Sequence, residues 1–316
     1  AHAQLANDVN LAISEFGDST SLFVCPLQYH GRGHEPYISE LGKSLDSNID
    51  LMWTGRQICS EYLEVIDAEN FYSFTNKRPF YWDNYPVNDV AMVHQLHIGP
   101  IDKRDRDLGK FSRGLVANPM DRFEASLIPL TTIADYLWNS ASYVPEKSWE
   151  YALSLFVPNP KDKDALRHLF RNCFESCLAV DAAPDFGAML GEITLAWRTG
   201  KLEVAVEILN RWSDDIASNY EIITSDSFSW PALKIEINPW LEKYKKVGIA
   251  LRDVAAVLSS AHFNEGRIVG TPEGAHNVRN IRISLAQDPT RIFGDGLDLV
   301  LGELATELSV AQEQRA

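Results

Sequence analysis

The chain has 316 residues, of which 45% are hydrophobic and 23% charged, a globular composition that excludes collagen-like and long disordered chains. Its 44 Asp and Glu outnumber its 29 Lys and Arg, which gives a net charge of −15. Because such a surface repels phosphate groups, we expect no nucleic-acid partner and no anionic membrane partner. No apolar run approaches the roughly 20 residues that a membrane helix needs. The length predicts two domains of about 150 residues or one large domain.

The four cysteines are too few for a disulfide framework in a chain of this length. Cys173 and Cys177 lie four apart in a helical pattern, which favours buried free thiols over a disulfide. No visible signal peptide and few cysteines favour an intracellular, cytoplasmic location. The chain begins at Ala1 rather than Met, which indicates processing, trimming or truncation.

The eight histidines show no spacing typical of a zinc site, because no Cys or carboxylate stands at zinc-like spacing beside the close pairs His30–His34 and His94–His97. We therefore expect no metal and no cofactor.

Four apolar runs of β-rich composition recur in the first 120 residues, at spacings of 28, 29 and 35: residues 22–25, 49–53, 79–82 and 114–117. A strand with its crossover helix needs about 30 residues, so these spacings predict βα units. The near-continuous apolarity predicts strands of a parallel sheet that are buried on both faces. We expect helices over residues 35–45, 67–76 and 122–138.

Polar or aromatic residues follow each predicted strand, and the carboxyl ends of barrel strands converge on one cavity. Taken singly, each of these residues fits ordinary turn chemistry. Their repetition after four successive strands favours a shared cavity lined by Tyr29, Thr54, Trp82, Asn84, Asp89 and Asn118.

Four units are half of an eight-unit barrel. We therefore expect an α/β fold in which residues 1–145 form the C-terminal half of a TIM (β/α)8 barrel and residues 146–316 form an α-helical bundle domain. A half-barrel exposes two parallel edges and an apolar interior, which promotes aggregation. The other four units should then lie upstream, on the same polypeptide or on an associated one.

From about Glu146 the apolar pattern repeats every 3.6 residues, which predicts packed helices. Pro239 should begin or kink one helix, and Thr271-Pro272 is typical of a helix N-terminus. Two stripes are predicted to be core: 166, 169, 170, 173 and 177, and 202, 205, 208, 209, 212 and 216. A heptad seam runs through 240, 244, 247, 251, 254 and 258, and leucines at 297, 301, 304 and 308 mark the last helix. These seams either close inside one subunit or mediate a homodimer. This half shows no catalytic motif.

Four blocks at the strand ends, at residues 25–29, 52–55, 82–89 and 117–120, resemble glycoside hydrolase family 84 in order and spacing. This family contains the O-GlcNAcases and bacterial hyaluronidase-like N-acetylglucosaminidases, in which a helical domain follows the barrel. Family members are often dimers through such helices. The resemblance covers residues 1 to about 155 and implies retaining hydrolysis of β-linked N-acetylglucosamine (GlcNAc), with the substrate's own acetamido oxygen forming an oxazoline.

The resemblance also implies the roles of the site residues. Asn84 lies near the acetamido group and the catalytic acids, Asp89 binds sugar hydroxyls, and Asn118 binds another hydroxyl. The acetamido group itself is surrounded by Cys25, Tyr29, Thr54, Ile58 and Trp82. Ile58 is a mild departure, because family members often carry another aliphatic residue there.

The reaction still needs two acids, one to orient the acetamido group and one to protonate the leaving oxygen. In the family these are adjacent aspartates after the fourth barrel strand. The one adjacent pair in this chain, Asp214-Asp215, lies in the helical half. We therefore expect no catalytic acid in this chain, an Asp-Asp pair upstream of it, and no hydrolysis by residues 1–316 alone.

Two hypotheses remain open. The first is an N-acetylglucosaminidase acting on a GlcNAc-bearing glycoprotein or glycan, for which protein Ser/Thr and glycan substrates are not separated by the sequence. The second is a non-catalytic GlcNAc-binding or scaffold protein that lacks the acids. An Asp-Asp pair ending an apolar strand upstream would favour the enzyme.

Overall fold

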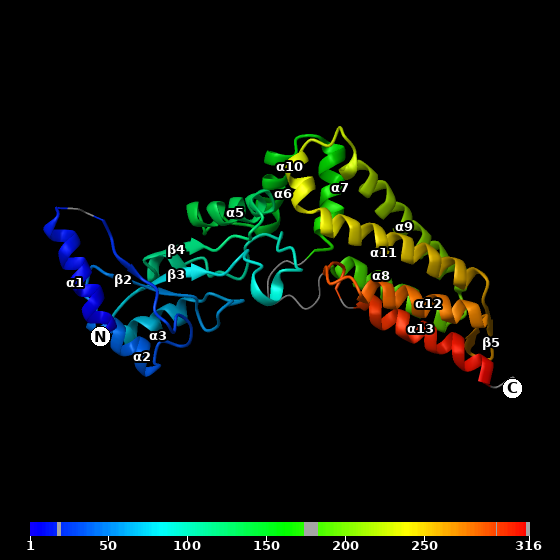
Figure 1. The fold of residues 1–316 in the computed structure, drawn as a ribbon, viewed down its shortest axis with the longest axis horizontal. Coiled ribbons are helices and arrows are strands. Elements are labelled where there is room, and N and C mark those ends of the chain that lie inside the picture. The colour runs from blue at the N-terminus through cyan, green and yellow to red at the C-terminus, as the bar shows by residue number, and fades with distance from the viewer. Residues whose placement is uncertain (18–19, 174–182, 295, 314–316) are drawn as a thin grey trace. The chain divides into compact units, whose positions relative to one another are not determined.

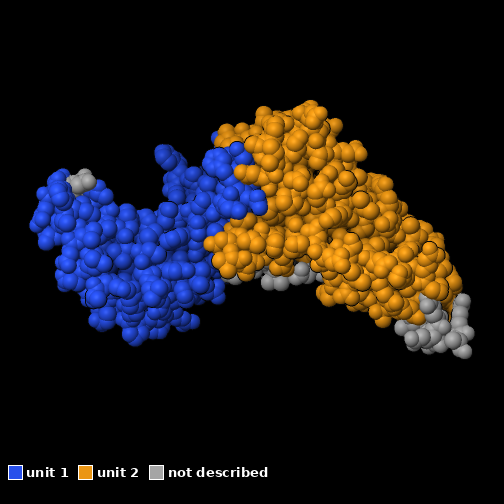
Figure 2. Space-filling view, viewed as in Figure 1, with its two compact units in different colours: residues 1–87, 100–152, 176–178 blue, residues 88–99, 153–175, 179–316 orange. Residues whose placement is uncertain are grey.

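A computed structural model describes residues 1–17, 20–173, 183–294 and 296–313, and these form two compact units. Unit 1 contains residues 1–87 and 100–152, and unit 2 contains residues 88–99, 153–173, 183–294 and 296–313 (Figure 2). In these ranges no helix is long and apolar enough to cross a membrane. Cys173 is buried as predicted, and burial raises the pKa of its thiol; Cys177 lies outside the described residues.

Unit 1 is built on a four-stranded parallel sheet whose strands follow one another in chain order (Figure 1). The strands are β1 (Phe23–Val24), β2 (Asp50–Trp53), β3 (Pro79–Asp83) and β4 (Gly114–Ala117). All four coincide with predicted strands. Parallel neighbours need crossover connections, and the chain between them supplies α2 (Pro36–Ser44), α3 (Val65–Thr75) and α4 (Leu108–Phe111).

Two further helices of unit 1 flank the sheet in sequence, α1 (His2–Glu15) and α5 (Phe123–Trp138). Pro36 begins α2, where a missing backbone N–H costs nothing, and Asn76 ends α3 in the left-handed conformation. The predicted helices 35–45, 67–76 and 122–138 are therefore confirmed to within two residues. The α/β class with a parallel sheet is confirmed as well.

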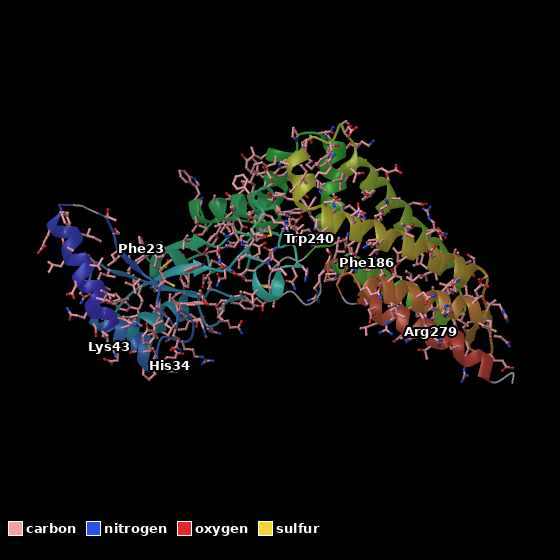
Figure 3. The ribbon with its side chains drawn as sticks, viewed as in Figure 1. Phe23, His34, Lys43, Phe186, Trp240 and Arg279 are labelled. Carbon is pink, nitrogen blue, oxygen red and sulfur yellow. The ribbon has the colours of Figure 1, made fainter. Side chains whose placement is uncertain are left out.

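The two faces of the sheet differ in burial. Leu51, Trp53 and Tyr81 lie on one face and are completely buried in a core that includes Ile38 of α2 and Phe71 of α3. The alternate residues point to the other face, where the exposed fraction is higher: Phe23, Met52, Phe80, Trp82 and Val116. Helices of this chain cover one face only, and the partly exposed second face agrees with the expectation that a half-barrel exposes its interior; burial of the strands on both faces stays a prediction. Phe23, labelled in Figure 3, packs edge-to-face on Phe80 with ring centroids 4.5 Å apart.

Unit 2 is helical, as the change of pattern near Glu146 predicted. A short 3-10 helix, η1 (Val90–Met92), belongs to it, and α6 (Pro145–Phe156) leads into it. The principal helices are α7 (Pro160–Phe170), α8 (Pro184–Arg198), α9 (Leu202–Thr224), α10 (Pro231–Glu236), α11 (Asn238–Ser259), α12 (Pro272–Ala286) and α13 (Gly296–Glu313). The predicted division at residues 145 and 146 coincides with the start of α6 and stays a prediction.

Several predicted features of the helical half are confirmed. Pro239 lies in the first turn of α11, and the Thr271 hydroxyl caps α12 by accepting a hydrogen bond from Gly274 N at 3.0 Å. The described members of both predicted stripes are buried, apart from the partly exposed Trp212. An antiparallel hairpin of β5 (His262–Asn264) and β6 (Arg267–Val269) was not predicted.

The heptad seam of α11 is buried inside the chain. All six seam residues are buried, and α11 packs along α9 while α12 packs on α13 (Figure 1). Trp240, the first residue of the seam, is labelled in Figure 3 and is 1% exposed. This apolar seam therefore closes within one subunit, and it no longer supports a homodimer.

We predict that Gly248→Ala destabilises unit 2, although Gly to Ala normally stabilises a helix interior. A Cβ at Gly248 would lie 2.6 Å from Cγ2 of Ile216 on α9, so α11 would have to move. Overpacking of this kind costs about 1–3 kcal/mol in the free energy of unfolding, measured with urea. The matched control is Gly191→Ala in α8, where a Cβ meets nothing within 4 Å and should stabilise by roughly 0.5–1 kcal/mol. Equal effects of the two substitutions would contradict the close crossing of α9 and α11.

Candidate functional site

The carboxyl ends of the four strands lie along one edge of the unit 1 sheet, because parallel strands in chain order all run the same way. Cys25 follows β1 directly and is exposed, Thr54 follows β2, and Asn118 follows β4. Trp82 is the penultimate residue of β3, and Asn84 follows that strand. Tyr29 and Ile58 lie in the loops after β1 and β2. Seven of the eight predicted site residues therefore belong to this edge.

Thr54 ties the loops after β1 and β2 together. Its backbone N–H donates to the carbonyl of Tyr29 at 2.8 Å, and its hydroxyl donates to the carbonyl of Gln57 at 2.7 Å. Gly31 N donates to the carbonyl of Gly55 at 2.9 Å, which adds a second link between the same loops. Thr54 is 2% exposed, so its hydroxyl proton serves the loop. The position of Thr54 beside a ligand's acetamido group stays a prediction; in the structure its hydroxyl helps to shape the loop after β2.

Two aromatic rings form a wall at the same edge. The rings of Tyr29 and Trp82 are stacked, with centroids 6.4 Å apart and an angle of 21° between their planes. Both side chains are half-buried, so each ring is supported by the protein and still reaches solvent. Trp82 stands on the sheet face that the helices of unit 1 leave open. Such a surface suits an apolar group, such as a methyl, presented by a small ligand.

A chain of hydrogen bonds joins the ends of β3 and β4 to the loop after β2. The side-chain amide of Asn118 donates to Oδ1 of Asn84 at 3.0 Å. The Asn84 amide in turn donates to the carbonyl of Ile58 at 2.8 Å. These two bonds fix the orientation of both side-chain amides, because each amide must point an N–H toward its acceptor. These two bonds use neither Oδ1 of Asn118 nor the second amide hydrogen of either asparagine, and groups of this kind can bond to hydroxyls.

Asp83 points away from this chain of bonds and forms a buried ion pair. Its two carboxylate oxygens accept from Nε and Nη2 of Arg104 at 2.8 and 2.6 Å, with both side chains less than a tenth exposed. Burial alone would lower the pKa of Arg104, but the Asp83 carboxylate outweighs it and raises that pKa above its usual value. Successive residues of a strand point to opposite faces, which agrees with the separate contacts of Asp83 and Asn84.

Arg104 is the residue of this region that the sequence reasoning missed. It lies in the charged run Lys103-Arg104-Asp105-Arg106-Asp107, which is typical of a solvated surface. The residue in the sequence that indicates a partner such as Arg104 is Asp83, at the end of a predicted buried strand. A carboxylate ending a buried strand needs a cationic partner, because an unpaired buried charge is very costly.

Asp89, the eighth predicted residue, belongs to unit 2. It is exposed and precedes η1, where its carbonyl accepts from Met92 N at 2.9 Å. Its neighbour Asn88 is buried and donates to the carbonyl of Gln95 at 2.9 Å, which holds the segment 88–95 in a compact turn. The role of Asp89 in sugar binding stays a prediction. Within the described ranges, no three His, Cys, Asp or Glu side chains are placed to hold a metal ion.

The fold and this edge define an α/β protein in which aromatic and amide side chains gather at the carboxyl ends of parallel strands. A family model for beta-N-acetylglucosaminidase (NAGidase) matches residues 1–171, more than half of the chain. The chain therefore belongs to the beta-N-acetylglucosaminidase family, which is glycoside hydrolase family 84, as the strand-end blocks predicted.

Individual relatives agree with this assignment. The protein O-GlcNAcase of Rattus norvegicus is 28% identical over 142 residues, which are 43% of this chain and 15% of the rat protein. A mutant O-GlcNAc hydrolase of Thermobaculum terrenum is similar in structure, with a TM-score of 0.88 and 26% identity over 99% of this chain and 67% of that one. CpGH84B has a TM-score of 0.79 at 22% identity, over 96% of this chain and 55% of its own, and shows the fold alone. The matched region is thus a small part of the rat relative.

We predict that Asp83→Asn strongly destabilises unit 1. The substitution leaves the guanidinium of Arg104 buried without its counter-charge, which costs about 3–5 kcal/mol in the free energy of unfolding. Urea denaturation measures the change. The control is Asp50→Asn, because its partner Arg113 is 59% exposed and such pairs contribute at most about 1 kcal/mol. The ion-pair argument fails if Asp83→Asn costs no more than Asp50→Asn.

Proposed function

We propose that this chain is part of a retaining β-N-acetylglucosaminidase that removes O-linked GlcNAc from protein Ser or Thr. The observation that carries the proposal is the stacked Tyr29–Trp82 pair beside the ordered Asn84–Asn118 amides at one edge of a parallel sheet. An apolar wall next to directional amides matches N-acetylglucosamine, which presents a methyl group and several hydroxyls together. Membership of family 84, and similarity to proteins named O-GlcNAcase and O-GlcNAc hydrolase, support the choice of O-GlcNAc.

The proposed architecture is the second half of an eight-stranded barrel followed by a helical domain. Its support is the sheet face carrying Phe23, Met52, Phe80, Trp82 and Val116, of which Phe23 and Val116 are each 42% exposed. In a closed barrel this face would turn inward and pack against the other four strands. We propose that those strands come from the same polypeptide or from an associated one.

Within this site, the acetamido group would be surrounded by Cys25, Tyr29, Thr54, Ile58 and Trp82. Thr54 would hold the loop that carries Ile58, through its bond to Gln57. Asn84 would lie beside the acetamido group, and Asn118 and Asp89 would bind sugar hydroxyls. These roles follow the family resemblance, and the side-chain directions of Tyr29, Trp82, Asn84 and Asn118 are compatible with them.

The proposed reaction is substrate-assisted. The acetamido oxygen attacks the anomeric carbon, the bond to the leaving oxygen breaks, and a general acid gives that oxygen a proton. Water then opens the oxazoline with retention of configuration. One carboxylate must orient the acetamido N–H while another serves as the acid. Asp83 is committed to Arg104 and Asp89 would bind hydroxyls, so we propose that both acids lie outside residues 1–316.

The function is tested with the longest natural form of the protein and 4-nitrophenyl N-acetyl-β-glucosaminide. Turnover that releases the β-anomer first, seen by proton NMR, would support the retaining mechanism. An O-GlcNAc peptide and a GlcNAc-terminated glycan, assayed side by side, decide the substrate class. Binding of N-acetylglucosamine without turnover would favour the alternative of a GlcNAc-binding or scaffold protein.

We predict that Asp89→Ala lowers kcat/KM on the aryl substrate about tenfold or more, because a charge-assisted hydrogen bond to sugar contributes roughly 1.5–3 kcal/mol. The control is Asp107→Ala, an exposed aspartate that forms an ion pair with Lys110, three residues on. A loss below about threefold for Asp89→Ala would remove Asp89 from the sugar site.

A homodimer through the helical domain also stays a proposal, now without the α11 seam. Its support is the exposed apolar side chains on four helices of unit 2: Leu195, Ile249, Ile283 and Leu299. Light scattering at micromolar concentration measures the mass directly. We expect twice the monomer mass, and a single monomer mass would reject the dimer.

A further inference from the structure

The guanidinium of Arg104 makes four hydrogen bonds in unit 1, three to two other segments and one to its own. Two go to the Asp83 carboxylate at the end of β3, at 2.8 and 2.6 Å. Nη1 donates to the carbonyl of Glu61 at 2.8 Å and to that of Asp102 at 2.9 Å. The planar guanidinium thus fixes three segments at once, which a flexible ammonium cannot do.

Two of these segments carry the two ends of a hydrogen bond in the candidate site. Asp83 precedes Asn84, whose side-chain amide donates to the carbonyl of Ile58. Ile58 lies three residues before Glu61 in the loop after β2. Arg104 therefore holds both the donor's strand and the acceptor's loop, through contacts on the side of β3 opposite to Asn84. Asn118 is connected to the same hydrogen-bond network, because its backbone N–H donates to the carbonyl of Asp83 at 2.9 Å.

The segment around Arg104 is itself firmly held. Leu63 N donates to the carbonyl of Lys103 at 3.1 Å, and Asp105 N donates to the carbonyl of Leu63 at 2.9 Å, so a parallel bridge brackets Arg104. Tyr136 of α5 donates its hydroxyl to the carbonyl of Asp105 at 2.8 Å. The backbone that carries Arg104 is therefore fixed, and the guanidinium bonds to the end of β3 from a well-held segment. A rigid second layer of this kind keeps functional side chains in one geometry.

We propose that Arg104 is a positioning residue for substrate binding and turnover, acting through Asp83 and the loop after β2 on Asn84 and Asn118. It touches no ligand in this proposal. Its effect on the reaction rests on the proposed function, whereas its effect on the two asparagines does not.

The first test is a double-mutant cycle in the longest natural form of the protein. Arg104→Lys keeps the positive charge but loses the planar guanidinium and its several N–H donors. We expect kcat/KM on the aryl N-acetylglucosaminide to fall about tenfold. Asn84→Ala should lower it at least as much. If Arg104 acts through Asn84, the double variant is no worse than Asn84→Ala within about twofold, whereas independent effects multiply. Multiplying losses, or an unchanged Arg104→Lys, would overturn the proposal.

Two controls separate positioning from stability. Arg113→Lys alters an ion pair with Asp50 at the amino ends of the strands, and should leave kcat/KM unchanged. Leu108→Ala removes core volume beneath the same sheet, and should lower the unfolding midpoint without changing kcat/KM. Suppose that Leu108→Ala and Arg104→Lys lower the unfolding midpoint equally. If kcat/KM then falls as far in Leu108→Ala as in Arg104→Lys, the loss comes from lower stability and the proposal is overturned.

The second test needs no turnover and distinguishes this proposal from the proposed function. Side-chain amide NMR signals of Asn84 and Asn118 are identified by their loss in Asn84→Asp and Asn118→Asp. We expect Arg104→Lys to shift both signals and speed their hydrogen exchange, and Arg113→Lys to leave them in place. Absent turnover in the unmodified protein, together with these shifts, would refute the proposed enzyme and support the positioning. Unmoved signals in Arg104→Lys would overturn the positioning.

Discussion

Parallel pairing in chain order is the constraint on which the rest of unit 1 depends. Because β1 to β4 all run the same way, each strand ends at the same edge and each following loop begins there. Residues as far apart in sequence as Tyr29 and Asn118 can then line one edge without any long-range motif. The helices that the crossovers require cover one face of the sheet and supply the core around Trp53 and Tyr81. Of the two aromatic residues stacked at the edge, Trp82 comes from the other face of the sheet.

The edge is ordered by polar contacts of two kinds. On one side of the strand ends, amide groups bond to one another and to a backbone carbonyl, as in the sequence Asn118 to Asn84 to Ile58. On the other side, a buried ion pair fixes the strand that carries them. The amides in the first group are neutral, whereas the charged pair in the second is buried where its partners satisfy it. Strand alternation alone separates the two kinds of contact.

The sequence predicted what depends on local pattern. The four strands, the helices α2, α3 and α5, the α12 cap at Thr271 and the start of α11 at Pro239 follow from short-range composition and spacing, whereas the four-residue helix α4 was not predicted. It also predicted which residues follow the strand ends, since that needs only the strand boundaries. It missed Arg104, whose partner lies 21 residues away behind a run of charges that looks solvated. It could not show that the Thr54 hydroxyl bonds to the carbonyl of Gln57, because a bond to a carbonyl three residues on depends on loop conformation. The β5–β6 hairpin was not predicted because its strands are three residues long and only half of their residues are apolar, although Glu265-Gly266 between them adopt the positive φ angles of a tight turn.

The hydrogen-bond chain from Asn118 through Asn84 to Ile58 contains carboxamides and a peptide carbonyl, and none of these groups gains or loses a proton in the range where proteins are folded. The guanidinium behind it stays charged throughout that range as well, with a pKa raised further by Asp83. This part of the edge therefore presents the same donors and acceptors from acid to alkaline solution. Any ionisation seen in a pH–rate profile would accordingly report on groups other than these amides, and would serve as a direct probe of whatever acids complete the site.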